Sequence, residues 1–313
     1  DGTQETLKNI PVYQMSIMDV SDCSKEKQEE TAASIRSEMS HHVFDPYQWP
    51  LFEFRGLVLG NGKNILFINI DMLIADGTSL VMIAKEIFIY YQNPDLKLPE
   101  MTYTFKEYMN SYTEFKQSDI YNKAKEYWMA RLDDIPASPS LPLKDSPSNI
   151  EKPVFKRKRI VLEKEKWIML KQKAMEKSIT PSALLLSAYA KVLSYWSGQD
   201  RFTVNLTVFN RYPFNEEVGK IIGDFTSIIL VDIDYDLKKD FWENATEVQV
   251  KMLEGLENRH FDGVNVISEL SRRNNSVGKA IMPVVFTSML FGESWDAWSS
   301  FGELREGISQ TSQ

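Results

Sequence analysis

The chain has 313 residues, of which 43% are hydrophobic and 12% aromatic, enough for two moderate cores because a single core stops growing at roughly 250–300 residues. Its 44 acidic and 36 basic side chains give a net charge of -8, so we expect no nucleic-acid partner. A single cysteine excludes an internal disulfide and fits a reducing cytosol, and three histidines leave little material for a soft metal site. Apolar runs stay below the ~18 residues of a membrane span, and no apolar leader opens the chain. These features predict a soluble, cytoplasmic protein without a membrane partner, and a first residue other than methionine indicates a piece of something longer.

In the first half of the chain, the clearest pattern is a β-hairpin over residues 51–71. Two β-rich runs flank the Gly-Asn-Gly at 60–62, a strong short-range turn signal. Apolar residues at helical spacing then predict a helix over 79–93 that ends before Pro94. Two further amphipathic helices, with aromatic stripes typical of core packing, are predicted over 104–117 and 123–135.

A stretch rich in proline and serine, residues 135–153, suits an extended linker better than a packed element. We place the lobe boundary here, which gives an N-terminal lobe over 1–150 and a C-terminal lobe over 151–313. Strands alternate with helices in both lobes, which indicates an α/β architecture. In the second lobe we predict a strand over 154–163, helices over 164–178 and 180–198, strands over 201–210 and 225–234, helices over 241–257 and 262–273, and a strand over 281–290.

Two carboxylates, Asp71 and Asp76, lie where the predicted hairpin gives way to the next helix. Because Asp76 directly precedes Gly77, one interpretation is a helix N-cap whose carboxylate accepts backbone N–H bonds. Asp71 closes an apolar strand and must be solvated or paired, most commonly in a salt bridge. A pair of carboxylates for acid/base chemistry is the alternative, which spacing alone does not specify.

The histidines offer little chemistry. His41 and His42 are adjacent and cannot both point into one site from a helix, so we interpret them as structural. His260 closes a predicted helical region among polar residues, and we expect a surface cation near a helix C-terminus.

Thr287 and Ser288 stand out because they interrupt a very apolar predicted strand. A hydroxyl there costs free energy unless it finds a hydrogen-bond partner. Two interpretations remain open: the main chain satisfies the hydroxyls, or Thr287 faces a cavity.

Five motifs follow one another along the chain. The segment from Asp71 to Ser79 reads Asp-x4-Asp-x-x-Ser, and IPASPSLPL, TPSALLLSAYAKVLSYW, GDFTSIILVDI and PVVFTSML follow in that order. Together they resemble the heterocyclization (Cy) domains of nonribosomal peptide synthetases, relatives of the condensation domains, over nearly the whole chain. Condensation domains carry His-His-x-x-x-Asp-Gly where this chain has Asp71 to Gly77. The family's first motifs would precede residue 1, and SQTSQ at 309–313 resembles the opening of its last motif, with Ser312 in place of the usual proline.

The resemblance implies an α/β fold of two chloramphenicol-acetyltransferase-like lobes, arranged as a V-shaped pseudodimer with a central tunnel. It implies no directly bound cofactor: substrates would arrive on the 4'-phosphopantetheine of upstream and downstream peptidyl carrier domains, beside an adenylation domain. The implied enzyme joins a carrier-bound acyl or peptidyl thioester to carrier-bound Cys, Ser or Thr. It then cyclodehydrates the product to a thiazoline or oxazoline, as in antibiotic biosynthesis.

Roles for individual residues also follow from the resemblance. Thr287 is the catalytic candidate, which would orient or relay a proton for an aspartate expected beyond Gln313. Asp76 is expected to pair with Arg211 across the tunnel and hold the lobes in register, and an ordinary surface pair of Arg211 is the alternative. The residues with an expected structural or motif role are Asp71, Asp76, Ser79 and Arg211, and the further tunnel candidates are Asp224, Thr226 and Ser288.

Two other functions remain open at this point. One is a plain amide-forming condensation domain without cyclization, which Asp71-Met72 disfavours because two histidines belong there. The other is a carrier-docking module that has lost its chemistry.

Overall fold

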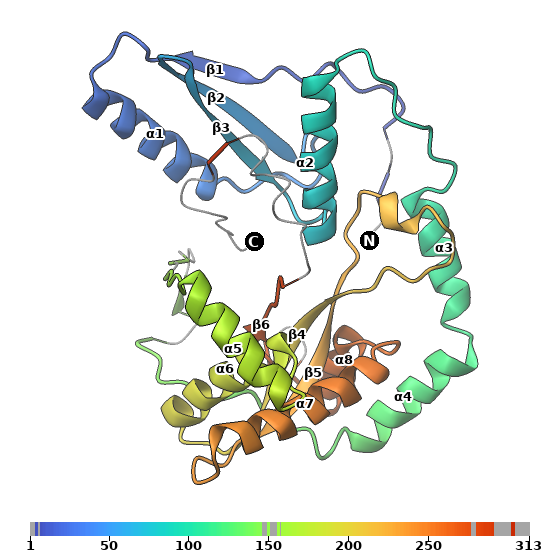
Figure 1. The fold of residues 1–313 in the computed structure, drawn as a ribbon. Helices are drawn as coiled ribbons and strands as arrows, with labels where there is room; N and C mark the ends of the chain where they lie inside the picture. Colours follow the sequence, from blue (N-terminus) through green and yellow to red (C-terminus); the bar gives the residue numbers. More distant parts are fainter. Residues whose placement is uncertain are drawn as a thin grey trace. The chain divides into compact units, whose positions relative to one another are not determined.

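The computed structural model of the chain describes residues 4–5, 7–145, 149–150, 155–156, 158–276, 280–290 and 302–303. These residues form two compact units, one up to Ala75 and the other from Asp76 onward. Figure 1 labels their helices and strands. Each unit combines helices with strands, which confirms the predicted α/β class. The lobe boundary expected near residue 150 stays a prediction.

The first unit is a three-stranded sheet with a helix packed on it. Strand β2 (Phe52–Gly60) pairs in parallel with β1 (Ser16–Asp19) and antiparallel with β3 (Lys63–Ile70). Helix α1 (Lys25–Ser40) buries only Ile35 and Met39. The sequence did not predict β1 or α1, because so few buried positions give α1 a weak apolar period and all four residues of β1 are exposed.

The predicted hairpin is confirmed, and its turn has the backbone that the sequence requires. Gly60, Asn61 and Gly62 have φ angles of 80°, 52° and 71°, a region that glycine and asparagine adopt at low cost. The antiparallel register runs from Phe52 to Val58 and shifts by a bulge just before this turn. The hairpin therefore delivers the chain directly to the aspartate motif.

The second unit is built on a sheet with strand order β5-β4-β6. The central strand β4 (Arg201–Phe209) runs antiparallel to β5 (Thr226–Asp234) and parallel to β6 (Val285–Phe286). β4 and β5 confirm two predicted strands, whereas β6 covers only two residues of the strand predicted over 281–290. The reason is local: Pro283 has no N–H to donate, and the preceding Met282 carbonyl accepts from the Asn205 side chain at 2.6 Å.

The helices of the second unit lie close to their predicted positions. Helix α6 begins after Thr180, whose hydroxyl accepts from the Ala183 N–H, and ends at Gly198, which has a φ of 67°. Within the described residues, none of the helices is both long and apolar enough to span a membrane. The helices are α2 (Gly77–Gln92), α3 (Phe105–Phe115), α4 (Asp119–Arg131), α5 (Lys164–Glu176), α6 (Pro181–Ser197), α7 (Phe241–Glu257) and α8 (Gly263–Arg273), with the short 3-10 helix η2 (Val218–Lys220).

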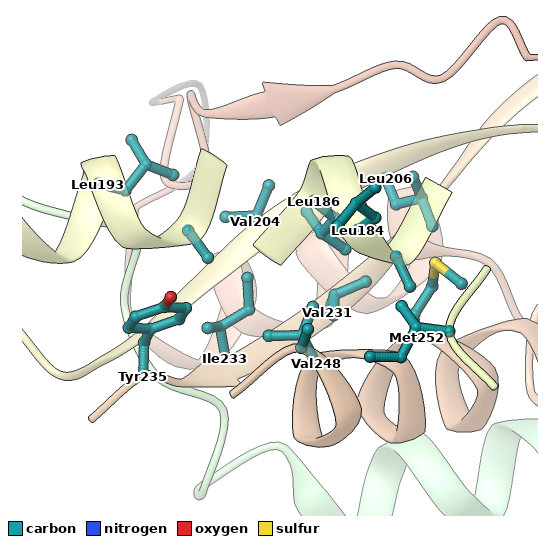
Figure 2. Close-up of a cluster of buried hydrophobic side chains, with 14 of the residues drawn as sticks. Leu184, Leu186, Leu193, Val204, Leu206, Val231, Ile233, Tyr235, Val248 and Met252 are labelled. Carbon is teal, nitrogen blue, oxygen red and sulfur yellow. The ribbon is translucent and has the colours of Figure 1, made fainter. Parts of the chain in front are cut away.

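The main core of this unit lies between one face of the sheet and helices α5 to α7. Complete burial of a valine, leucine, isoleucine or methionine side chain stabilises a fold by about 1.5–3 kcal/mol. The side chains of the main core therefore hold the sheet firmly. Leu230 alternates to the other face of β5 and joins Trp128 of α4 and Val266 of α8 in a second core. Figure 2 shows Leu184, Leu186 and Leu193 of α6, Val204 and Leu206 of β4, Val231 and Ile233 of β5, and Val248 and Met252 of α7 gathered in the main core.

The linker prediction is wrong for its first residues. Thr203 on β4 donates from its hydroxyl to the Pro136 carbonyl at 2.7 Å and from its N–H to the Ala137 carbonyl at 3.0 Å. Leu141 packs against the main core. This part of 135–153 is held because the main-chain groups of a buried strand need partners.

The strand predicted over 154–163 is also wrong for the residues described there. Residues 158–163 belong to none of the strands, and Ile160 and Val161 are 94% and 72% exposed. Isoleucine and valine favour strands only where a neighbouring strand and a packed face receive them, which the described sheets do not provide here.

Candidate functional site

Asp76 is the N-cap of α2, as one interpretation of the sequence predicts. Its backbone is extended, with φ -88° and ψ 179°, and its Oδ1 accepts from the Ser79 N–H at 2.7 Å. Its own N–H donates to the Gly223 carbonyl at 3.0 Å. The side chain of Asp76 is completely buried, so every one of these contacts is shielded from solvent.

The Ser79 hydroxyl ties the same helix end to the Gly223 peptide. Its oxygen accepts from the Gly223 N–H at 3.1 Å and lies 2.9 Å from the Gly223 carbonyl oxygen and 2.7 Å from Asp76 Oδ1. A hydroxyl has one proton, so it donates to one of these two oxygens at a time. Ser79 therefore acts as a junction between α2 and the segment before β5.

Arg211 completes the network, and its expected pair with Asp76 is present. Nη2 donates to Asp76 Oδ1 at 2.8 Å and to the Ser79 oxygen at 3.0 Å. Nη1 donates to the carbonyls of Val218 and Ile221 at 3.0 and 2.8 Å. The guanidinium carbon lies 3.9 Å from the centre of the Phe225 ring, a distance at which cation–π attraction operates.

Gly223 is required by the closeness of this packing. A Cβ at this position would lie 2.6 Å from Phe105 Cδ2 on α3. The absence of a side chain lets the peptide reach both Asp76 and Ser79, so the network has no room for a larger residue.

This geometry agrees with the architectural role expected of Asp76, which stays a prediction. A group that transfers a proton must reach its substrate, whereas Asp76 exposes none of its side chain and directs Oδ1 to three donors. Asp76 and Arg211 both belong to the second compact unit. The expectation that their pair holds two lobes in register across a tunnel stays a prediction.

Asp71 belongs to the first compact unit and closes β3. Its N–H donates to the Leu51 carbonyl, and its Oδ1 accepts from the Leu73 N–H, both at 2.9 Å. The side chain is 6% exposed. These bonds shape the turn that leaves the hairpin, which agrees with a structural part for Asp71 but does not test its expected salt bridge.

Thr287 lies directly after β6, at the end of the sheet where β4 also ends. Its Oγ1 is 2.8 Å from Oγ1 of Thr207, and both side chains are accessible to solvent at this contact. Its hydroxyl thus finds a side-chain partner rather than the main-chain partner that the first interpretation supposed. That Thr287 faces a cavity, the second interpretation, stays a prediction.

The residues that follow Thr287 point to different elements. The Ser288 hydroxyl lies 2.9 Å from the Ser182 hydroxyl on α6. The next residue, Met289, lies against the start of α2, since a Cβ on Gly77 would be 2.7 Å from Met289 Cε. The Thr287 segment and the Asp76 network are therefore neighbours at the N-terminus of α2.

Asp224 and Thr226 lie at the same end of the sheet, where β5 begins. Asp224 Oδ1 accepts from the Thr226 N–H at 2.9 Å, and Thr226 pairs with Phe209 at the end of β4. Thr226 is exposed. The role of both residues, and of Ser288, as tunnel residues stays a prediction.

His260 is not a surface cation, contrary to the prediction. It is 9% exposed, and its Nδ1 lies 3.3 Å from the Tyr212 hydroxyl and its ring 5.5 Å from the Phe115 ring. Burial, together with the neighbouring charge of Arg259, lowers the pKa of His260 below its ordinary value. Burial likewise raises the pKa of Tyr212, so both groups stay neutral around pH 7.

The contacts of the other two histidines are local, which agrees with the structural interpretation but does not test it. His41 is the C-cap residue of α1, with Nδ1 2.7 Å from the Ser37 carbonyl, and His42 packs on Phe44. Among the described residues, no group of three or more His, Cys, Asp or Glu side chains is arranged to hold a metal ion.

The sequence analysis did not single out Thr207 and Gly223 as partners of the motif residues. A signal for Thr207 exists, because polar Thr203, Asn205 and Thr207 alternate with apolar residues along β4. Gly223 opens the motif GDFTSIILVDI, but its need for a bare Cα comes from Phe105 on a distant helix.

Comparisons with known proteins identify the family of the chain. The model of the Condensation domain family matches residues 4–309. Bacitracin synthase 1 of Bacillus licheniformis is 39% identical over all of this chain, which covers 6% of that protein. Phenyloxazoline synthase MbtB of Mycobacterium sp. (strain MCS) is 28% identical, again over all of this chain and 26% of that protein. The chain thus spans a small part of the length of these curated relatives.

A solved structure shows the same fold. The cyclization-docking bidomain of the EpoB nonribosomal peptide synthetase from Sorangium cellulosum superimposes with a TM-score of 0.80 at 30% identity. The match covers 90% of this chain and 57% of that one. The chain belongs to the condensation-domain family, and within it resembles the cyclization domains of nonribosomal peptide synthetases.

Proposed function

We propose that this chain works as the heterocyclization domain of a nonribosomal peptide synthetase. It would condense a carrier-bound acyl or peptidyl thioester with carrier-bound Cys, Ser or Thr and then close a thiazoline or oxazoline ring. The observation that carries the proposal is the solvent-accessible Thr287 hydroxyl beside a network whose Asp76 is fully buried. The similarity to a cyclization domain and to a phenyloxazoline synthase supports it.

The first stage forms an amide and asks little of the side chains. The thioester is already activated, so alignment of the two carrier arms supplies most of the acceleration, with roughly 7–11 kcal/mol available from proximity. The 4'-phosphopantetheine arms of an upstream and a downstream carrier domain would present the two substrates. An adenylation domain of the same synthetase would load the acceptor.

The second stage closes the ring and demands proton transfer. The acceptor's thiol or hydroxyl adds to the new amide carbonyl carbon, which forms the ring bond and turns the carbonyl oxygen into a hydroxyl. That hydroxyl leaves as water while the amide nitrogen loses its proton and the C=N bond forms. A positioned acid/base typically contributes ~10²–10⁴-fold to such a step.

Thr287 fits this stage as an orienting or relaying group. A threonine hydroxyl is too weak an acid and base to carry the proton transfer alone, but it donates and accepts hydrogen bonds. The aspartate that the resemblance places beyond Gln313 would transfer the proton. In this division of labour, Thr287 holds the departing oxygen while the aspartate protonates it.

Intact-mass analysis with loaded carriers tests the proposal in the full synthetase. The wild type is expected to convert the linear amide into a product lighter by one water. Thr287→Ala is expected to accumulate the open amide, whereas Thr113→Ala is expected to match the wild type. Thr113 is a suitable control because its exposed hydroxyl bonds only the Met109 carbonyl of its own helix.

Three outcomes would contradict the proposal. An open amide as the final product of the wild type would favour a plain condensation domain. Binding of loaded carriers without any product would favour a docking module. Ring closure at the wild-type rate in Thr287→Ala would remove Thr287 from the chemistry.

A further inference from the structure

We propose that Thr207 is a positioning residue for ring closure, which acts by donating its hydroxyl proton to the oxygen of Thr287. This inference rests on the proposed function and adds a residue to it. Its basis is the 2.8 Å contact between the two Oγ1 atoms at the end of the central sheet.

Thr207 differs from the polar residues before it on the same face of β4. Thr203 donates to the Pro136 carbonyl and Asn205 to the Met282 carbonyl, and these residues are 0% and 4% exposed. Both side chains bond a main-chain carbonyl of a neighbouring segment, as expected of structural hydrogen bonds. Thr207 instead meets a side-chain hydroxyl at a solvent-accessible contact.

The strand register holds the two hydroxyls together. Asn205 lies opposite Val285 and Leu206 opposite Phe286 in the parallel pair β4–β6. The Asn205 N–H also donates to the Val284 carbonyl at 3.0 Å. Continuing this register by one residue brings Thr207 opposite Thr287, so the contact is built by the backbone and does not depend on long, mobile side chains.

Either hydroxyl can donate to the other, and only one of the two directions leaves Thr287 with a proton for the substrate. One proton lies between the two oxygens, and the other hydroxyl proton remains free. When Thr207 donates, the free proton belongs to Thr287 and can be donated to the departing oxygen of the substrate. Because hydrogen bonds in a chain polarise one another, accepting from Thr207 also makes Thr287 a better donor.

Amide formation does not need this donor, since the thioester is already activated. Loss of the Thr207 hydroxyl should therefore slow ring closure without slowing amide formation. A general defect in folding or carrier binding would slow both stages together.

The test compares Thr207→Val, which keeps the shape and removes the hydroxyl, with Thr207→Ser, which keeps the hydroxyl. Full synthetase with loaded carriers is sampled over time, and open amide and ring product are measured by intact mass. Thr207→Val is expected to slow ring closure roughly 3- to 10-fold, the worth of one hydrogen bond, with unchanged amide formation. Thr207→Ser is expected to restore the wild-type ratio of the ring-closure rate to the amide-formation rate. Thr203→Val is expected to leave this ratio unchanged even if it lowers the melting temperature.

A double variant separates positioning from an independent effect. If Thr207 acts through Thr287, adding Thr207→Val to Thr287→Val should slow ring closure no further. The inference would be overturned if the two substitutions multiplied their effects on the rate of ring closure, or if Thr207→Val closed the ring at the wild-type rate. It would also be overturned if Thr207→Ser failed to restore ring closure, or if Thr207→Val slowed amide formation as much as ring closure. A wild type that makes rings while Thr207→Val matches it refutes only this inference; a wild type that makes no ring refutes the proposed function and this inference with it.

Discussion

The Asp76 network and the Thr207–Thr287 pair are two polar clusters of the same compact unit with opposite character. The first joins charged groups that are 0% and 11% exposed, and Nη1 and Nη2 of its arginine are directed at fixed acceptors. The second is a neutral pair of hydroxyls with solvent beside it. The contrast shows that a carboxylate in a sequence motif can belong to the buried framework, whereas the hydroxyl that we propose for the chemistry lies at a solvent-accessible contact.

The largest expected effect comes from breaking the buried ion pair. Arg211→Met would leave the Asp76 carboxylate buried without its cation and should lower the free energy of unfolding by roughly 3–5 kcal/mol, measured by urea denaturation. The matched control is Arg273→Met, because Arg273 meets Asp133 at the same 2.8 Å with side chains 43% and 88% exposed. This exposed pair should be worth about 0–1 kcal/mol. Equal losses in the two variants would show that burial is not what separates them.

A second, smaller effect tests the packing around the network. Gly223→Ala places a Cβ 2.6 and 2.9 Å from two ring carbons of Phe105 and should cost about 1–3 kcal/mol through overpacking. Gly219→Ala is the control, because nothing lies within 4 Å of the added Cβ. If thermal unfolding shows the two variants to be equally stable, the network tolerates displacement and is not rigid.

A pH titration tests the burial of His260 beside Tyr212 and Phe115. The pKa of His260 is lowered in the folded chain, so its contribution to stability is present above the unfolded pKa of about 6.5. That contribution is lost as the pH falls through the lower folded value, because the unfolded state then binds the proton more readily. His260→Phe should flatten the fall in unfolding free energy between pH 7 and 5 ( gives the linkage), compared with the exposed His42→Gln. An unchanged slope would mean that His260 titrates normally.

The smallest expected effect on stability concerns the Thr207–Thr287 pair. Thr287→Val removes a solvent-accessible hydroxyl and should change the free energy of unfolding by no more than about 0.5 kcal/mol. Thermal unfolding is the measurement. A loss above about 2 kcal/mol would place the hydroxyl pair among the structural contacts.

The elements with strong local signals were predictable from the sequence. The Gly60–Gly62 turn, the Thr180 cap and the alternation along β4 are short-range patterns, and each appears where its residues indicate. Helix α1 and strand β1 escaped prediction because they bury little. The strand predicted over 281–290 was too long because Pro283 and the Asn205 side chain interrupt its pairing.

The candidate site also has parts that were expected from the sequence and parts that were not. The Asp76–Arg211 pair was expected from a resemblance, and the N-cap from the sequence itself, since capping is local. Gly223 and the burial of His260 depend on residues far away in the sequence, Phe105 for the first and Tyr212 for the second. Such long-range contacts leave no trace in the spacing of one motif.

The span of the Asp76 network has a consequence for how the protein is made. Asp76 and Arg211 are 135 positions apart, so a ribosome adding ~5–20 residues per second needs roughly 7–27 seconds between them. During that interval the start of α2 is synthesised but lacks the cation that later neutralises its cap. We expect this helix end to be open to proteases and chaperones on nascent chains, and to close only once Arg211 and Gly223 have emerged.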